Sequence, residues 1–382
     1  MAQFPILTHD QLIKKIAKFD VKHYCATRNY LDGWVSNLSA YITHGIITID
    51  EIVRLSLAQY TIDQAEMRYK ELLRREYFTQ IHWWKGDAIF DDMEEDKTGI
   101  AKYDIMPAKL KTKTFESAWV NEIILQMETS GYLHNHQRMW LASYMSHYQR
   151  LYRRKCADRS YYHFMDGELG SNHLSWQRVQ STFAHKPYYM NEDNLKRYGK
   201  YTDPVYRGTY EEIEQMLFDT GRVVERSDHD DLPYTLETDV SMIAIANETY
   251  HWYTILTPWD LRPSKIVDPD KTICILDHSF TQQHPRSSNR VAFVQSYSDL
   301  YGISFVYGDI HQIVQNSQDL SVYETRNPVY RKAYKQASTR SDVICHQYQW
   351  CSPVVARWYT KKFFPFWAQT KIHLIALEQT IF

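Results

Sequence analysis

The sequence lacks several features that would assign it to a special class of protein. No stretch approaches the roughly 18 apolar residues that a membrane-spanning helix requires. Residues 1–15 lack a basic start followed by an apolar core, so no secretion signal is expected. The five cysteines are odd in number and scattered along 382 residues. This pattern indicates reduced thiols in a cytoplasmic protein rather than a disulfide framework, and it predicts no bound metal.

The sequence also lacks an excess of charge of either sign. Its 44 lysines and arginines face 46 aspartates and glutamates, for a net charge of −2. A DNA-binding surface would therefore have to be local. What the chain does have is 30 tyrosines and 11 tryptophans. Most such rings fill cores, but their number also suits a protein that stacks a flat cofactor or bases.

The first two hundred residues have the pattern of helices. A helix is predicted over 117–131, where apolar residues recur at helical spacing between a capping serine and a terminal glycine. Further helices are predicted over 62–84 and 133–155. The last turns of the 133–155 helix hold four basic residues, which would suit a helix C-terminus: Arg150, Arg153, Arg154 and Lys155.

Beyond residue 201 the pattern changes to short apolar segments between helical ones. The acidic stretch 227–233 predicts a solvated connector. Strands are predicted over 241–246, 253–256, 272–276, 304–307 and 342–345, with helices over 290–300 and 330–337. Strands that alternate with helices indicate a parallel sheet. We therefore expect an α + α/β protein: an all-helical domain (1–205), a linker (206–238) and a smaller Rossmann-like parallel α/β domain (239–382).

Two polar segments of the helical half could line a ligand site. Asn135, Arg138, Met139 and Ala142 recur at positions that share one helix face. That face suits the wall of a pocket for a polar heteroaromatic ligand, although mixed faces are also common toward solvent. Residues 166–177 are expected to form a loop with two glycines, carrying Asp166, Glu168, Asn172 and Trp176. Its carboxylates and amide can bond sugar hydroxyls or ring N–H groups; a purely structural loop is the alternative.

Together these segments resemble the FAD-binding region of the photolyase/cryptochrome family. The family's G-W-M-H-N-x-x-R-M is similar to GYLHNHQRM at 131–139. Its D-G-D-L-A-x-N-x-x-x-W is similar to residues 166–176, after a matching interval.

Further segments extend this resemblance in both directions. Tyr24, Arg28 and residues 35–45 resemble the tyrosine and the T-S-R-L-S-x-Y-L-x-x-G segment that hold the FAD phosphates. Residues 71–78 are similar to the family's E-L-x-W-R-E-F-Y, and 186–191 resemble the segment that closes the domain.

The resemblance implies a helical domain that holds a U-shaped FAD. Its implied cofactor contacts are Tyr24, Ser36, Leu38, Ser39, Arg75, Arg138, Asp166, Glu168 and Asn172. In this assignment Arg138 pairs with Asp166, and Asn172 addresses N5 of the flavin. Trp176 would be the first electron donor in photoreduction. Two departures are Glu168, where the family has aspartate, and Asn37, where it often has arginine.

The resemblance also implies a reaction on damaged DNA. Glu71, Asn135 and Met139 match the groups that contact a cyclobutane pyrimidine dimer. The two tryptophans that sandwich the dimer are replaced by Arg74 and Arg178. Base–aromatic stacking contributes about 1–3 kcal/mol per base, which guanidinium stacking and phosphate pairing would have to replace.

Two more features bear on this reaction. The family's middle electron-transfer tryptophan aligns with Arg153, which cannot carry a hole, so Tyr144, Tyr148, Tyr152 and Trp140 are candidate relays. Seven basic residues form either a phosphate-tracking rim or a solvated helix end: Lys109, Lys111, Lys113, Arg150, Arg153, Arg154 and Arg159.

The C-terminal half offers a candidate for the family's antenna domain, moved behind the FAD domain. Residues 254–262, 290–300 and 303–309 resemble its opening strand, helix and following strand, and an unrelated Rossmann-like domain is the alternative. A second antenna chromophore would be of unknown identity. Three functions stay open: a photolyase-like repair enzyme, a cryptochrome-like blue-light photoreceptor or redox sensor that binds FAD, and a binding module that has lost the flavin. Damaged DNA is the expected partner, with no membrane and no indicated protein partner.

Overall fold

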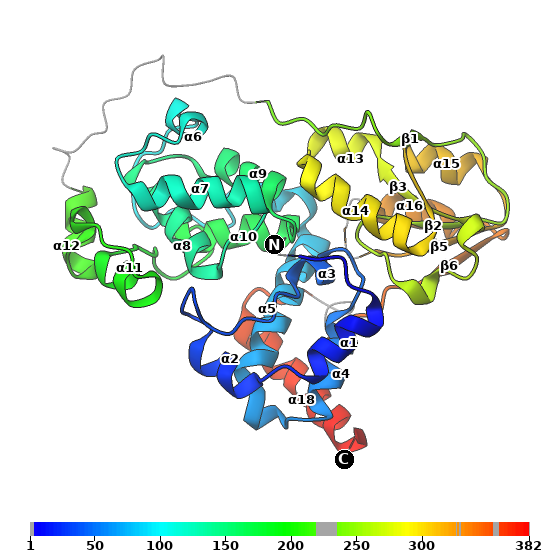
Figure 1. Ribbon diagram of the computed structural model, residues 1–382, viewed down its shortest axis with the longest axis horizontal. Coiled ribbons are helices and arrows are strands. Elements are labelled where there is room, and N and C mark those ends of the chain that lie inside the picture. Colours follow the sequence, from blue (N-terminus) through cyan, green and yellow to red (C-terminus); the bar gives the residue numbers. More distant parts are fainter. Residues whose placement is uncertain (1–3, 219–234, 326, 328–329, 354–358, 382) are drawn as a thin grey trace. The chain divides into compact units, whose positions relative to one another are not determined.

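The computed structural model describes residues 4–218, 235–325, 327, 330–353 and 359–381. Backbone contacts divide the chain into two compact units (Figure 1). Unit 1 consists of Met1–Cys25, Ser36–Gly86 and Glu237–Phe382, and unit 2 of Ala26–Val35 and Asp87–Leu236. The predicted domains 1–205 and 239–382 are continuous stretches of the sequence, whereas these units combine separate stretches. The predicted domains stay a prediction. The predicted acidic connector, 227–233, lies outside the described residues.

Unit 1 contains a helical part built from distant stretches of the sequence. Its helices are α1 (His9–Ala17), α3 (Ser39–Thr43), α4 (Ile49–Leu57), α5 (Ile62–Lys85) and α18 (Phe363–Ile381), and α2 (Val21–Thr27) begins in it. Thr8, Thr48 and Thr61 start α1, α4 and α5 with reciprocal capping boxes, in which the hydroxyl and the side chain three residues later each satisfy a backbone N–H. The predicted helix over 62–84 is confirmed.

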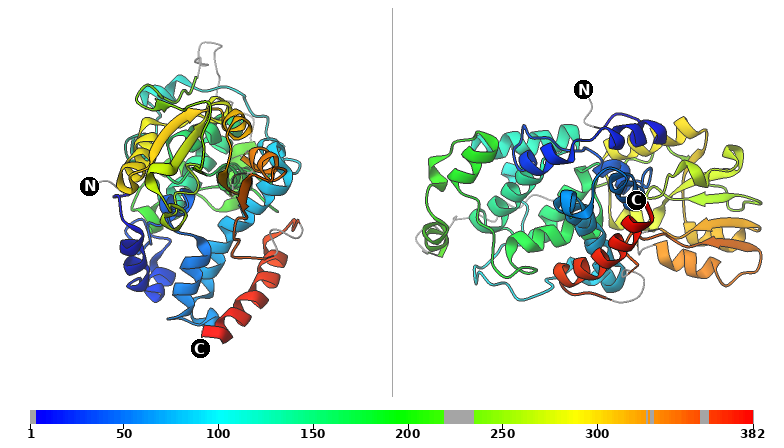
Figure 2. Two further views of the ribbon diagram at one scale, coloured as in Figure 1. Left: turned by 90° about the vertical axis from the view of Figure 1, so that its right-hand side faces the viewer. Right: turned by 90° about the horizontal axis from the view of Figure 1, so that it is seen from below.

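Helix α18 packs along α5, as the views in Figures 1 and 2 agree. The backbone N–H of Ile62 donates to Glu378 Oε1 at 3.0 Å. Buried Glu76 of α5 accepts hydrogen bonds from the backbone N–H groups of Cys351 (2.8 Å) and Ser352 (2.9 Å). The segment before α18 and α18 itself therefore belong to the same core as α5.

The rest of unit 1 is a six-stranded parallel sheet. Its strands are β1 (Ala244–Ile245), β2 (Thr254–Leu256), β3 (Thr272–Asp277), β4 (Ser304–Gly308), β5 (Leu320–Tyr323) and β6 (Val343–His346), in the order β1-β4-β3-β2-β5-β6. The chain moves outward from β2 in both directions, so the topological switch point lies between β2 and β5. All five predicted strands are confirmed, and β5 was not predicted.

Helices make the crossovers after β3, β4 and β5, whereas the 3-10 turns η6 (Pro263–Lys265) and η7 (Pro269–Lys271) lie between β2 and β3. The crossover helices are α13 (His278–Gln283), α14 (Ser288–Tyr301), α15 (Ile310–Asn316) and α16 (Arg331–Ala337). Strand β3 is buried along its whole length, as expected for the centre of such a sheet. The predicted fold class, helices followed by a smaller parallel α/β part, is confirmed.

Unit 2 is helical. Its elements are η1 (Gly86–Phe90, which starts at the unit boundary), α6 (Ala108–Thr112), α7 (Ala118–Ser130), α8 (Asn135–Ser143), the π-helical turn η2 (Tyr144–Tyr148), α9 (Arg153–His163), α10 (Leu169–Gln180), α11 (Glu192–Gly199), η3 (Pro204–Tyr206) and α12 (Tyr210–Phe218). Its largest core is rich in aromatic and branched side chains from α7, α8 and α10. In the described parts of the chain, no helix combines the length and apolarity needed to span a bilayer.

The single helix predicted over 133–155 is wrong. The chain forms α8, then η2, and then breaks at Arg150, whose φ is +52°. The break is stabilised by a bridge between Tyr103 and Leu151, in which Tyr103 N donates to Arg150 O at 2.7 Å. Arg153, Arg154 and Lys155 therefore lie in the first turn of α9 and not in a last turn.

The loop predicted over 166–177 is also wrong beyond Glu168. Glu168 is the N-cap of α10, so Asn172 and Trp176 project from a helix. Neither glycine interrupts it, because Gly167 precedes the helix and Gly170 lies in its first turn, where Glu168 satisfies its N–H.

Candidate flavin site

The best-defined part of the predicted site is an ion pair between α8 and the segment before α10. Arg138 Nη2 lies 3.0 Å from both Oδ1 and Oδ2 of Asp166. Arg138 Nε also donates to Leu133 O at 2.9 Å, and its guanidinium lies over the ring of Phe164, 4.0 Å from the centroid. The Asp166 side chain is 6% exposed, so the pair holds an oriented carboxylate charge at the edge of the interior. The predicted pairing of Arg138 with Asp166 is confirmed.

Glu168 uses its carboxylate to start α10. Oε1 accepts from Gly170 N at 3.0 Å and Oε2 from Ser171 N at 2.7 Å. Asp309 accepts from the corresponding two N–H groups at the start of α15, so this capping does not require the longer arm of glutamate. A carboxylate oxygen accepts more than one hydrogen bond, so Glu168 can bond a further donor while it caps α10. Its predicted role toward the ribose side of FAD stays a prediction.

Asn172 and Trp176 follow on α10, at successive turns. Asn172 Nδ2 donates to Ala157 O on α9 at 2.7 Å, which fixes the amide plane and leaves a second N–H and the oxygen for other partners. Trp176 is buried in the main core of unit 2. Arg178, two residues later, is exposed.

The start of α8 carries the residues predicted to contact a lesion. Asn135 is exposed, and its Nδ2 lies 3.4 Å from the sulfur of Met139. The flanking histidines are largely enclosed, and His134 Nε2 lies 3.0 Å from Arg28 O. Burial lowers the pKa of His134, and burial together with His134 and Arg28 lowers the pKa of His136 to about 4. Both imidazoles are therefore neutral near pH 7.

Unit 1 holds the residues predicted to bind the FAD phosphates. Ser39 begins α3, directly after the buried N-cap Leu38, and Ser36 is half-buried before it. Arg75 Nη2 on α5 donates to Thr43 Oγ1 at the end of α3. Thr43 was not predicted, although its position four residues after Ser39 on one helix face was readable from the sequence.

Tyr24 and Arg68 form a second contact in unit 1. Arg68 is 3% exposed and lies over the ring of Phe19, 4.4 Å from the centroid, and 6.0 Å from that of Tyr24. Tyr24 packs beside Phe19 with a ring separation of 5.6 Å. The buried Arg68 was missed because nothing local distinguishes it from a surface helix arginine.

The predicted lesion-binding Arg74 lies under the C-terminal segment. Its guanidinium is 4.7 Å from the ring centroid of Phe363, the first residue of α18, and its Nε is buried without a hydrogen bond to any described residue. Glu71 lies half-buried three residues earlier on α5. Stacking of Arg74 therefore takes place within the chain itself.

Arg153 does not belong to a basic rim. It is fully buried, with Nε 2.9 Å from Asp92 Oδ1 and Nη2 3.1 Å from Phe90 O. Other members of the predicted rim are paired: Lys109 with Glu116, Lys113 and Arg159 with Glu128, and Arg154 with Asp91. The predicted phosphate-tracking rim is therefore wrong at Arg153 and largely neutralised elsewhere.

The rings of Trp119 and Tyr201, which were not predicted as electron relays, connect several of the predicted ones. Tyr201 lies 6.2 Å from Trp140 and 6.4 Å from Trp119, and Trp119 lies 5.9 Å from Tyr144, by ring centroids. Tyr144 in turn stacks 6.3 Å from Tyr148. These rings form one continuous aromatic path inside the core of unit 2.

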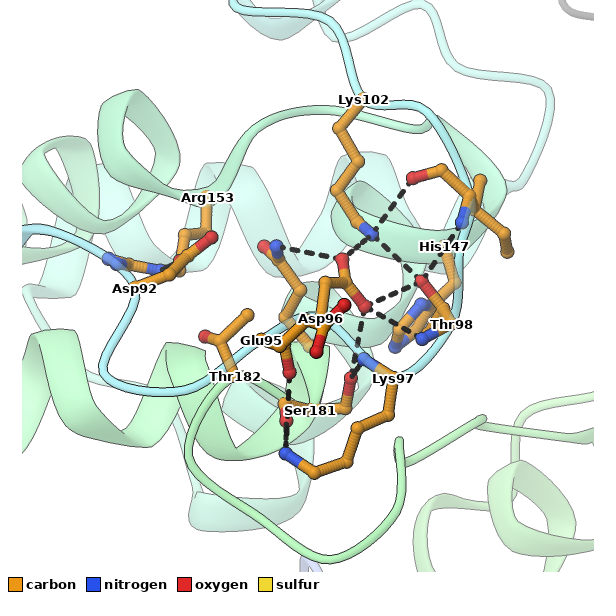
Figure 3. Close-up of polar contacts among 12 residues, drawn as sticks. Asp92, Glu95, Asp96, Lys97, Thr98, Lys102, His147, Arg153, Ser181 and Thr182 are labelled. Carbon is orange, nitrogen blue, oxygen red and sulfur yellow. Dashed lines mark hydrogen bonds and ion pairs between the residues drawn. The ribbon is translucent and has the colours of Figure 1, made fainter.

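A polar cluster fixes the segment 91–98 onto the end of α10 (Figure 3). Asp96 Oδ1 accepts from Thr98 N (2.8 Å), Thr98 Oγ1 (2.7 Å) and Ser181 Oγ (3.1 Å), while Oδ2 lies 2.5 Å from Lys102 Nζ. Burial alone would raise the pKa of Asp96, but hydrogen bonds from Lys102 and Thr98 lower it to about 2. Gln177 adds contacts to Ile89 O and Met93 N at 2.8 and 2.9 Å. The helix that carries Asn172 and Trp176 is thus held from both ends.

The predicted site residues fall into one group in each unit. Tyr24, Ser36, Leu38, Ser39, Glu71, Arg74 and Arg75 lie in unit 1, and Asn135, Arg138, Met139, Asp166, Glu168, Asn172, Trp176 and Arg178 lie in unit 2. Within each unit, residues from separate helices come together. That the two groups converge on one flavin stays a prediction.

Comparison with known proteins gives a family for part of the chain. Residues 67–210 match the family described as the FAD-binding domain of DNA photolyase. This range includes α5 from Met67 onward and the group in unit 2, whereas Tyr24, Ser36, Leu38 and Ser39 lie before it. No curated protein matches the chain in sequence.

Two solved structures are similar over about half of the chain. A cryptochrome from Synechocystis sp. PCC6803 aligns with a TM-score of 0.45 and 16% identity, over 54% of this chain and 46% of its own. A class III photolyase from Agrobacterium tumefaciens aligns with a TM-score of 0.42 and 17% identity, over 52% of this chain and 43% of its own. The aligned region therefore spans less than half of either protein. The family match identifies residues 67–210 as a FAD-binding domain of the photolyase/cryptochrome family.

Proposed function

We propose that the chain is a flavoprotein that binds FAD and uses it for light-driven electron transfer. The observation that carries this is the Arg138–Asp166 pair, together with the fixed amide of Asn172, inside the matched range. These groups fit a flavin: the oriented carboxylate has lone pairs left for ring or ribityl donors, and the fixed amide offers both a donor and an acceptor. Arg75, Ser36 and Ser39 suit phosphate, because guanidinium and hydroxyl groups donate to its oxygens.

Each residue has a role that its own contacts support. Arg138 orients the carboxylate of Asp166, and Ala157 fixes the amide plane of Asn172. Trp176 lies in a dry core, where its indole is shielded from water and available as an electron donor. When bound, reduced flavin supplies the electron that blue light drives toward an acceptor.

Absorption of the purified protein tests the first part. We expect a flavin spectrum that Arg138→Met reduces, because Asp166 then lacks its partner. Arg154→Met is the matched control, since Arg154 is half-exposed and 3.8 Å from Asp91. A protein that folds but contains no flavin and takes up none would contradict the proposal and leave a binding module without cofactor.

For the electron acceptor we propose a cyclobutane pyrimidine dimer in DNA. Support comes from Asn135 and Met139, which are adjacent on the exposed start of α8, and from Glu71 on α5. Amide and carboxylate groups are suited to recognise a dimer by hydrogen bonds to its base edges. Arg178 is exposed on α10, and its guanidinium group could stack on a base or pair with phosphate.

A blue-light photoreceptor or redox sensor is the second candidate, and two observations favour it. Arg74 is already stacked on Phe363, and most of the expected basic rim is neutralised by acidic neighbours. The first leaves less stacking surface for a flipped lesion, and the second leaves less positive charge for its phosphates.

Repair is tested by incubating the reduced protein with dimer-containing single-stranded and double-stranded DNA under blue light. Light-dependent loss of dimers, reduced by Asn135→Ala but not by the exposed Ser175→Ala on the same unit, supports repair. Photoreduction without any loss of dimers would contradict repair and leave the sensor. A second antenna chromophore, proposed for the α/β part, would add an absorption band that is not that of flavin.

A further inference from the structure

A buried arginine before α14 has no partner for its charge among the described residues. Arg286 is 1% exposed, and its Nε, Nη1 and Nη2 make no hydrogen bond to the described parts of the chain. Its guanidinium lies 4.4 Å from the ring centroid of Trp259 and 5.5 Å from that of Phe280. A guanidinium stays cationic in proteins, and buried charges are normally paired. An anionic partner other than the described residues is therefore expected.

Hydroxyl groups in the three segments that supply Arg286, Phe280 and Trp259 also lack partners among the described residues. Ser287 Oγ, Thr281 Oγ1 and Thr257 Oγ1 are buried and make no hydrogen bond to any described residue. Ser287 is the N-cap of α14, yet its side chain makes no capping hydrogen bond. The positive end of a fourteen-residue helix, a free hydroxyl and an unpaired guanidinium thus occur at consecutive positions of the chain.

The acidic side chains that follow β2 and β3 already have partners. Asp277 accepts from Phe280 N at 2.8 Å through Oδ1 and from Ile310 N at 3.1 Å through Oδ2. Asp260 is paired with Lys265 through Oδ2, while its Oδ1 is buried and makes no hydrogen bond to a described residue. Neither carboxylate neutralises Arg286.

The fold places these groups where parallel sheets bind ligands. Strands β2 and β3 are neighbours, with Leu256 opposite Cys274, so the segments that follow them emerge at the same edge. Ligands of doubly wound sheets bind outside this carboxyl edge, and β2 also borders the switch point between β2 and β5. Burial raises the pKa of the Cys274 thiol, and the nearby charge of Arg286 opposes that rise; Cys274 is the third residue of β3.

The loop after β2 is held by the helical part of unit 1. His44 Nδ1 lies 2.6 Å from Pro258 O, and Leu261 N donates to His44 O at 2.9 Å. Gly45 has a φ of +66°, and a Cβ there would lie 2.6 Å from Trp259 O. Trp259, and with it the ring under Arg286, is therefore fixed in place before any ligand binds.

We propose that Arg286, Ser287 and the N-terminus of α14 bind the phosphate group of a small phosphorylated molecule. A guanidinium fork and a helix N-terminus both match the geometry of phosphate oxygens. A nucleotide and free inorganic phosphate share this chemistry. The site uses none of the residues assigned to FAD.

The test is thermal unfolding of the full-length protein, carrying its flavin, in adenosine monophosphate, inorganic phosphate or sodium chloride of equal ionic strength. A ligand that binds only the folded state raises the midpoint with its concentration. We expect at least one phosphate probe to raise it beyond chloride and Arg286→Met to abolish that rise, with affinity weaker by about tenfold or more. Arg331→Met is the control, because Arg331 lies 4.3 Å from the Trp83 ring centroid but is not buried.

The outcomes distinguish the possibilities. A response to adenosine monophosphate alone identifies a nucleotide, and an equal response to inorganic phosphate identifies a free phosphate site. Ser287→Ala, which leaves no charge unpaired, weakens binding even if Arg286→Met does not fold. Equal midpoint rises in wild type, Arg286→Met and Ser287→Ala, or no rise with either probe, overturn the proposal. An Arg138→Met protein that lacks flavin keeps the response, so failure here is separable from failure of FAD binding.

Discussion

Arg153 is fully buried, and its Nε lies 2.9 Å from Oδ1 of Asp92, a residue 61 positions earlier in the chain. The guanidinium occupies the position at which the family resemblance places an electron-transferring tryptophan. Asp92 is one-third exposed, so water also stabilises its charge. The guanidinium of Arg153 is buried and therefore depends on the carboxylate more strongly than the carboxylate depends on it.

The first prediction follows from this inequality. Asp92→Asn leaves a buried cation without its counter-charge and should lower the free energy of unfolding by about 3 kcal/mol. Arg153→Met leaves only a partly hydrated carboxylate and should cost less. Urea unfolding of both variants and of the double variant measures this, and a double variant less stable than Asp92→Asn alone would contradict it.

The second prediction concerns Asp96 and acid. Its pKa is lowered to about 2 in the folded protein, below the ordinary value of 3.8, so the folded state prefers the charged carboxylate. The stability that it contributes is present above pH 4 and is lost as the pH falls toward 2. Because Asp96 is partly exposed, we expect about 1–2 kcal/mol.

Melting curves between pH 2 and pH 6 test this with Asp96→Asn. The variant should lose stability at pH 6 and show a shallower acid dependence. Asp299→Asn on α14 is the control, since Asp299 is exposed. Parallel acid profiles for wild type and Asp96→Asn would count against the role of the cluster.

The third prediction concerns His147, which is fully buried with Nε2 3.0 Å from Val179 O. Burial lowers its pKa from 6.5 to about 4. The unfolded chain therefore takes up a proton between pH 6.5 and 4 that the folded chain refuses, and stability falls as the pH falls through that window. The loss amounts to at most about 3 kcal/mol.

His147→Gln keeps an N–H donor for Val179 and does not titrate. We expect its midpoint to change less than that of wild type between pH 6.5 and 5, as measured by circular dichroism. An unchanged pH slope would show that His147 is not the group responsible.

The fourth prediction concerns Glu76, whose buried carboxylate accepts the N–H groups of Cys351 and Ser352. Glu76→Gln turns one acceptor into a donor facing an N–H, which should cost about 2 kcal/mol and loosen the segment before α18. Limited proteolysis should then cut after residue 350 more rapidly. Glu66→Gln is the control, because Glu66 makes only surface ion pairs with Lys70 and Lys371 and should cost under about 0.5 kcal/mol.

The sequence predicted elements whose signals are local. Helix α7 runs from Ala118 to Ser130, as expected from its periodic apolar residues and from Gly131, which adopts a φ of +65° at the C-cap. Five of the strands were predicted for the same reason. Strand β5 was missed because it is only four residues long and has Ser321 among its apolar side chains.

The failures involve partners distant in the sequence. The break at Arg150 depends on the bridge between Tyr103 and Leu151, and the burial of Arg153 depends on Asp92. The pairing of Arg138 with Asp166 was predicted only through the family resemblance. No periodicity indicated that Phe363 would cover Arg74, because their separation of 289 positions is bridged by the whole sheet part of the chain.

The packing of α18 on α5 has a consequence for synthesis on the ribosome. Every residue of unit 2 has been translated before the first strand of unit 1 is made, so unit 2 is free to fold during elongation. In helix α5, by contrast, the apolar side chains that pack against α18 stay exposed until α18 has left the exit tunnel. A chaperone that binds exposed apolar helices would therefore meet this chain at α5, late in translation, rather than at the flavin-binding helices of unit 2.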